Sequence, residues 1–230
     1  MGVSITVVPV TSTLNRVMIA DLGMSALLVS LLVALPYLLS PLQAPLGAWA
    51  DSHPIGGKRR TPWIIGGGLL AATGSYFTAH SAYWMATDFT AGLLAAVIAF
   101  ALWGVGVNAA SVSYLALTAE LADEEGRSRA VSIMWTAMIL STIGVSLGLS
   151  RMLDPYSPEA LYTAFGAVWL ASVVLVLAGA YSLEPSAGAA SSRSQDRTSP
   201  GQAMRLLALN PVARRFFVYL VLVLVSIHAQ

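Results

Sequence analysis

Long runs of apolar residues alternate with short polar segments along this chain. A helix needs about 20 apolar residues to cross the roughly 30 Å of hydrocarbon in a bilayer. Several runs approach or exceed that length. The pattern therefore predicts an all-α membrane protein, with spans over residues 25–46, 62–79, 90–119, 130–150 and 160–183.

The first apolar run, residues 1–14, is shorter than a span and ends at the polar pair Asn15–Arg16. Either this helix begins upstream of the sequence, or it continues through Asn15 and Arg16 to Ala20. We favour the first alternative. Counting this helix, the predicted bundle has six transmembrane helices and occupies residues 1–183.

The segment after the bundle changes character. Residues 184–210 are rich in Ser, Ala, Gly and Arg without periodicity, which is typical of a flexible linker; residues 204–209 are a short amphipathic stretch. Residues 211–230 then begin a seventh helix, whose apolar run over 216–227 is too short to cross. Six helices, a linker and a seventh helix predict half of a twelve-helix transporter architecture, with a second half on further sequence.

Details of the spans refine these expectations. Pro36, Pro41 and Pro45 lie in the second span, where proline kinks a helix. Residues 80–88 are expected to form a turn whose Tyr83 and Trp84 suit a membrane interface. The fourth span is too long for an upright helix, so it tilts or extends past the bilayer. Residues 120–129 are expected to form a charged loop.

Composition supports a membrane protein. Hydrophobic residues make up 57% of the chain, charged residues 10%, and the mean hydropathy is +0.73, whereas about a quarter of the residues in a soluble domain are charged. The lipid bilayer is thus the expected surrounding, and nothing indicates nucleic acid as a partner. The absence of cysteine excludes disulfides, thiolate metal sites and cysteine nucleophiles.

The cations predict an orientation. Ten of the twelve Lys and Arg residues lie after the second, fourth and sixth spans or beside the seventh; the exceptions are Arg16 and Arg151. Because Lys and Arg are retained on the cytoplasmic side, the N-terminus and the central linker are expected in the cytoplasm.

The polar segment 47–61 carries the most specific signal. Gly47, Asp51 and Gly56 precede the cations Lys58, Arg59 and Arg60, and residues 52–55 stretch the spacing. This segment resembles the loop motif of the major facilitator superfamily. The resemblance implies a facilitator-type bundle whose cytoplasmic charges pair and lock the outward-facing state. A simpler interpretation of these charges is that they anchor the topology and attract anionic lipid. The predicted charge network comprises Asp51, Lys58, Arg59, Arg60, Glu120, Arg127 and Arg129.

A narrower resemblance covers nearly the whole chain. Residues 13–18 with Asn15 and Arg16, residues 34–36, 59–62 and 210–211, and Arg214-Arg215-Phe216 resemble the PucC/LhaA branch of that superfamily. The family signature residues are Asn15, Arg16, Gly47 and Gly56. This branch comprises light-harvesting complex assembly proteins, also described as bacteriochlorophyll delivery proteins. The resemblance implies antenna or reaction-centre subunits and a tetrapyrrole pigment, (bacterio)chlorophyll, as partners.

A few side chains are candidates for binding. Asn108, deep in the fourth span, either contacts a substrate or pigment or forms an interhelical hydrogen bond. His53, His80 and His228 are candidate ligands for chlorophyll magnesium, although solvated histidines are ordinary at membrane boundaries. Gly144 and Gly148 are spaced for helix packing. No ionisable residue lies near the middle of the second to sixth spans, which disfavours a proton-coupled pump.

Catalysis is not expected. Residues 123–125 are the one acidic cluster, whereas a prenyltransferase would need paired acidic motifs to hold magnesium and diphosphate. The predicted function is assembly of photosynthetic complexes, with an apolar cavity between two halves, lined by the first, second, fourth and fifth spans, sheltering the pigment. The alternatives are a secondary transporter of a small or amphiphilic solute and a permanent structural subunit of an antenna or reaction-centre complex.

Overall fold

A computed structural model describes residues 1–40, 43–52, 55–121 and 124–180, together with Pro211, Arg215 and Tyr219. These residues are helical apart from short turns and one isolated bridge between Ile55 and Lys58, so the all-α class is confirmed. The predicted linker lies outside the described residues, as does the apolar run of the seventh helix apart from Tyr219. The helical elements are η1 (Ser4–Thr6), η2 (Pro9–Leu14), η3 (Val17–Asp21), α1 (Ala26–Leu38), α2 (Gln43–Ser52), α3 (Thr61–Thr87), α4 (Phe89–Leu121), α5 (Glu124–Met152) and α6 (Pro158–Ala180).

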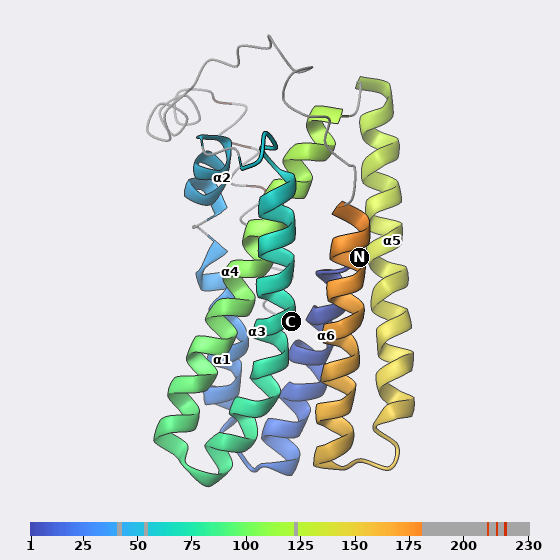
Figure 1. Cartoon of the computed structure of the whole chain (residues 1–230). Helices are drawn as coiled ribbons and strands as arrows, with labels where there is room; N and C mark the ends of the chain where they lie inside the picture. The colour runs from blue at the N-terminus through green and yellow to red at the C-terminus, as the bar shows by residue number, and fades with distance from the viewer. Residues whose placement is uncertain are drawn as a thin grey trace. The chain divides into compact units, whose positions relative to one another are not determined.

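Helix α3 lies at the centre of the bundle (Figure 1). It packs most extensively against α4 and next against α6, while α1 packs against α4 and α5 lies at the edge beside η1 and α6. The core between these elements combines the N-terminal segment, α4 and α6, with Leu14, Met18, Phe100 and Phe165 among its most buried side chains.

The N-terminal segment is helical without interruption from Ser4 to Asp21, as π-type turns in η2 and η3 join short α-helical stretches. The backbone therefore continues through Asn15 and Arg16, which is the alternative that we did not favour. Asn15 is half-buried and Arg16 is exposed, so the pair lies along one helix rather than in a loop.

The predicted second span is wrong as a single helix. α1 ends at Leu38 and α2 begins at Gln43. Proline disfavours helical backbone at the residue before it, and Ser40 stands before Pro41, so the chain leaves the helix here instead of only bending. α2 then runs to Ser52 and includes the first residues of the polar segment 47–61.

Residues 55–58 of this polar segment form a tight turn. The backbone N–H of Ile55 donates to the Lys58 carbonyl at 3.0 Å, and the Lys58 N–H donates to the Ile55 carbonyl at 3.1 Å. Gly56 and Gly57 have φ values of 59° and 76°. A two-residue connection of this kind needs positive φ at both central positions, which only glycine adopts without strain.

The predicted turn over residues 80–88 is also wrong. α3 continues to Thr87, and Asp88 alone separates it from α4. The Asp88 carboxylate accepts a hydrogen bond from the N–H of Ala91 at 3.1 Å, so Asp88 caps the start of α4. The expected charged loop over 120–129 is likewise mostly helical, because α4 ends at Leu121 and α5 begins at Glu124.

Three helical segments in the described part of the chain are long and apolar enough to cross a membrane: Phe89–Thr118, Ser128–Met152 and Pro158–Ala180. α3 is long but less apolar, since small and polar residues such as Gly67, Ser75 and Thr78 are buried in the bundle. α1 is short, with 13 residues, because the chain breaks before Pro41. The six-span count therefore stays a prediction.

α4, with 33 residues, is about 50 Å long at 1.5 Å per residue and exceeds the hydrocarbon thickness, as expected.

Glycines bring α3 and α4 into close contact. A Cβ atom on Gly106 would lie 2.3 Å from the Ala71 nitrogen, and one on Gly74 would lie 2.4 Å from the Trp103 nitrogen. Small residues at such positions let helix backbones approach in membranes. By contrast, a Cβ on Gly144 or Gly148 would meet nothing within 4 Å. That face of α5 is therefore open among the described residues, and helix packing at this pair stays a prediction.

Candidate functional site

The break between α1 and α2 creates a polar site inside the bundle. The last carbonyls of a helix lack partners within the helix, and the Pro36 carbonyl lies in the final turn of α1. The Asn108 side chain of α4 donates from Nδ2 to this carbonyl at 3.1 Å, and its Oδ1 accepts a hydrogen bond from Gln43 Nε2. Asn108 is 6% exposed, so one buried amide ties together α1, α2 and α4.

Neighbouring groups complete this polar site. Ser40 donates a hydrogen bond from its hydroxyl to the Tyr37 carbonyl. Trp103 Nε1 donates to the Thr6 hydroxyl at 3.0 Å, which links α4 to the N-terminal segment. The polar atoms around the break are thus largely satisfied within the protein.

A cavity of about 230 Å³ adjoins Asn108. It touches the first, second and fourth of the predicted spans but no residue of α5. Ligand pockets usually measure roughly 300–1,000 Å³, so this cavity is too small to enclose a tetrapyrrole. Its lining residues are Val7, Pro36, Tyr37, Ser40, Gln43, Trp103, Val107, Asn108 and Ser111.

Asn108 forms hydrogen bonds between helices and also lines a cavity, so the structure bears on both interpretations of this residue. The interhelical hydrogen bond is present, and contact with a pigment stays a prediction. Sequence reasoning missed Gln43 and Trp103 as parts of this site. A polar amide between Pro41 and Pro45, in an otherwise apolar run, was the available signal for Gln43.

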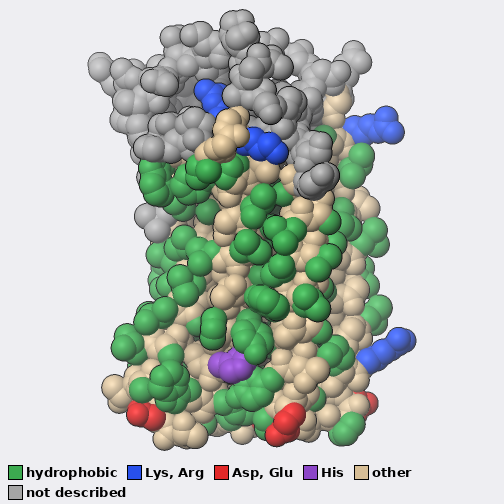
Figure 2. Space-filling model, in the orientation of Figure 1, with side chains coloured by type: hydrophobic (Ala, Val, Ile, Leu, Met, Phe, Trp, Pro, Cys, Tyr) green, Lys and Arg blue, Asp and Glu red, His purple; other side chains and the backbone are tan. Residues whose placement is uncertain are grey.

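The charged end of the bundle follows the Ile55–Lys58 turn. Figure 2 shows most of the described Lys and Arg side chains towards one end of this face and one nearer the other end, where the described Asp and Glu side chains lie. Arg60 is 7% exposed, Lys58 is half-buried, and Arg59 and Arg129 are exposed. The side chains of Asp51, Glu120 and Arg127 lie outside the described residues, so the predicted charge network stays a prediction.

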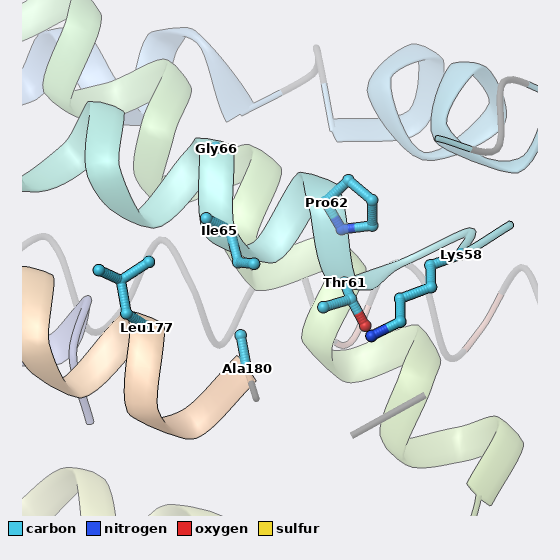
Figure 3. A pocket seen from close by; sticks show the side chains of 7 residues that line it. All are labelled: Lys58, Thr61, Pro62, Ile65, Gly66, Leu177 and Ala180. Atoms are coloured by element: carbon cyan, nitrogen blue, oxygen red, sulfur yellow. The ribbon is translucent and has the colours of Figure 1, made fainter. Parts of the chain in front are cut away.

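A second cavity of about 810 Å³ lies at this basic end (Figure 3). It is bounded by the first turns of α3 and the last turn of α6, and the Lys58 side chain reaches it from the turn. A cation beside an apolar wall suits the headgroup and chain of an anionic lipid. The lining residues are Lys58, Thr61, Pro62, Ile65, Gly66, Leu177 and Ala180.

The remaining candidates are separate from these sites. His80 lies within α3 rather than in a turn, while His53 and His228 lie outside the described residues. Asn15 Oδ1 is buried and has no hydrogen-bond partner among the described residues. Gly47 is buried in α2, where a Cβ would lie 3.0 Å from a Val112 methyl group, and Gly56 forms the tight turn. These two signature glycines therefore have structural roles.

Together these features define a class: an all-helical membrane protein with a basic end, a buried amide at a broken helix and two cavities. Comparison with known proteins gives the family. The chain belongs to the PUCC protein family, whose model matches residues 13–230. Among solved structures, the comparison finds no match, so the facilitator-type arrangement stays a prediction.

Relatives in phototrophic bacteria agree with this assignment. The chain is 32% identical over 194 residues to protein PucC of Cereibacter sphaeroides, covering 80% of this chain and 42% of that protein. It is 37% identical over 179 residues to a protein of Rhodobacter capsulatus named bacteriochlorophyll synthase 44.5 kDa chain, covering 77% and 41% respectively. The chain thus spans about two fifths of the length of these relatives.

Proposed function

We propose that this protein acts in the assembly of light-harvesting complexes and that it handles (bacterio)chlorophyll without chemistry of its own. The observation that carries this proposal is the family match over residues 13–230. The name of one relative, a bacteriochlorophyll synthase chain, adds an association with bacteriochlorophyll. Antenna or reaction-centre subunits and the pigment are then the expected partners, together with a second half of a facilitator-type fold.

The absence of catalysis is part of the proposal, although one relative is named a synthase chain. The acidic cluster over 123–125 has no second acidic motif in the sequence to share a magnesium diphosphate. This lack of a second motif favours a binding protein over a prenyltransferase.

We place the protein in a bacterial photosynthetic membrane with its basic end in the cytoplasm. The excess of described Lys and Arg side chains at that end in Figure 2 supports this orientation. The Asn108 cavity is too small for a tetrapyrrole. We place the pigment on the lipid-facing surface or against a second half of the protein rather than in either cavity. A pigment on the surface can be passed to an antenna subunit without leaving the membrane.

Co-purification tests this function. The protein, isolated from a phototrophic host under mild conditions, is expected to carry bacteriochlorophyll and antenna subunits in less than stoichiometric amounts. Stoichiometric recovery after stringent washing would instead identify a permanent subunit. Recovery of neither pigment nor antenna subunits would contradict the proposal.

A flux assay in proteoliposomes addresses the transporter alternative. A secondary transporter would show solute flux that Asp51→Asn abolishes and that Asp88→Asn, at the other end of α3, leaves intact. We expect no flux that depends on Asp51. This pair of variants separates a role of the carboxylate in transport from a general effect of removing a charge.

A further inference from the structure

A hydrogen bond to the backbone selects one tautomer of the neutral His80 ring. Its Nδ1 atom lies 3.2 Å from the backbone carbonyl of Tyr76, one turn earlier in α3. A carbonyl only accepts hydrogen bonds, so Nδ1 carries the proton and Nε2 keeps its lone pair. No partner of Nε2 is found among the described residues.

Aromatic rings fix the imidazole in place. The ring centres of Tyr76 and Tyr162 each lie 4.5 Å from that of His80, with interplanar angles of 48° and 32°. Phe77 approaches from the same helix at 6.3 Å. Because Tyr162 belongs to α6, the two helices hold the side chain jointly and its orientation is set before any ligand arrives.

The surface around His80 is apolar and exposed. Phe77 and Trp84 lie one turn on either side of it along α3 and are 49% and 51% exposed. Trp169 of α6, which is 38% exposed, contacts the ring of Tyr76. Figure 2 shows the histidine among hydrophobic side chains, away from the basic end. A flat apolar ligand can cover such a surface and remove it from lipid.

We propose that His80 Nε2 is the axial ligand of the magnesium of a (bacterio)chlorophyll bound on the lipid-facing surface of α3 and α6. This inference rests on the proposed function and assigns it a site. A neutral imidazole nitrogen is a common metal ligand, and a ligating histidine normally donates its other N–H to a carbonyl or carboxylate. The Nδ1 bond to Tyr76 supplies that second contact.

The donor set fits a metallotetrapyrrole better than a free ion. A free metal ion needs several protein ligands, and no cluster of three candidate side chains occurs in the described part of the chain. Magnesium in a tetrapyrrole already has four nitrogen ligands and takes a single axial one. One histidine in an aromatic, apolar surface therefore matches the pigment, whereas it would hold a free ion poorly.

Pigment titration of the full chain in lipid nanodiscs tests this site. The probes are bacteriochlorophyll a and bacteriopheophytin a, which is the same macrocycle without magnesium. His80→Phe keeps an aromatic ring but removes the ligand. We expect its Kd for bacteriochlorophyll a to rise at least about tenfold, in line with losses seen when metal-site contacts are removed, and its Kd for bacteriopheophytin a to stay the same. The position of the Qx absorption band of the bound pigment depends on the number of axial ligands. This band should therefore shift when His80→Phe removes the imidazole ligand.

Two further variants distinguish ligation by His80 from a structural role of its side chain. Imidazole added to His80→Gly should restore both affinity and the Qx position, which a merely structural role of His80 would not allow. Tyr83→Phe is the matched control: it removes the hydroxyl that bonds to Tyr156 but keeps the ring beside Tyr162. Its affinity for bacteriochlorophyll a should equal that of the wild type.

Three results would overturn the inference. If His80→Phe binds bacteriochlorophyll a as tightly as the wild type, the pigment lies elsewhere and the proposed function survives. If the wild type binds both pigments equally well, magnesium takes no ligand from the protein. If the wild type binds neither pigment, the His80 site is excluded, while a role in antenna assembly is judged separately by the antenna content of cells that lack the gene.

Discussion

At the scale of single residues, Asn108 shows how a membrane bundle tolerates a broken helix. The break before Pro41 leaves the Pro36 carbonyl without a partner in an apolar interior, where an unsatisfied polar group is costly. The Asn108 amide satisfies that carbonyl from the neighbouring helix and also binds Gln43. The sequence makes Asn108 a candidate for ligand contact, but these two hydrogen bonds are enough to explain why a polar residue lies there.

Gly106 provides a prediction at the same scale. Gly106→Ala should place a methyl group 2.3 Å from the Ala71 nitrogen, so α3 and α4 must move apart. Overpacking of this kind typically costs about 1–3 kcal/mol. We expect a lower midpoint of thermal unfolding for the purified protein in detergent, measured by loss of helical circular dichroism.

Gly144→Ala is the matched control, since a Cβ there meets nothing within 4 Å. Its midpoint should equal or slightly exceed that of the wild type, because alanine favours helix over glycine by roughly 1 kcal/mol. Equal destabilisation by both substitutions would contradict the close packing of α3 and α4 and the open face of α5.

At the scale of elements, the existence of the helices was predictable and several of their ends were not. Apolar runs located α3, α4, α5 and α6. The end of α3 at Thr87 and the start of α5 at Glu124 were missed because the polar and aromatic residues there were interpreted as loops. Such residues do not by themselves end a helix. α3 ends where Asp88 caps the start of α4 by accepting a hydrogen bond from the Ala91 N–H. An Asp three residues before the bonded N–H is a helix-start signal that the sequence already contained.

The candidate sites were predictable in residue type rather than in arrangement. Asn108 and His80 stood out because they are polar in apolar surroundings. Their partners, the Pro36 carbonyl and the rings of Tyr76 and Tyr162, depend on the break in the second span and on the pairing of α3 with α6. Neither follows from local periodicity. The glycines of α3 and α4 could have been found, since Gly67 and Ala71 share the spacing that drew attention to Gly144 and Gly148.

At the scale of the whole molecule, the charges define two ends and predict an orientation. The chain has no cysteine, so single cysteines can be introduced without background. Ile55→Cys lies in the basic turn and Tyr156→Cys in the connection between α5 and α6, and both positions are exposed. We expect a membrane-impermeant maleimide added to intact spheroplasts to label Cys at 156 and to leave Cys at 55 unlabelled until the membrane is opened.

Labelling in the reverse order would show that the basic end faces outward and would contradict the proposed orientation. Labelling of both positions from outside would mean that the bundle does not separate the two ends across a membrane. Detergent-solubilised protein serves as the control, because both cysteines should then react.

The central claim is that this member of the PUCC family supports the assembly of light-harvesting complexes. The most direct measurement is the near-infrared absorbance of antenna complexes per cell in a phototrophic host with and without the gene. We expect deletion to lower the antenna bands severalfold while free bacteriochlorophyll continues to be made, and we expect the intact gene to restore these bands. Unchanged antenna absorbance in the deletion strain would contradict it.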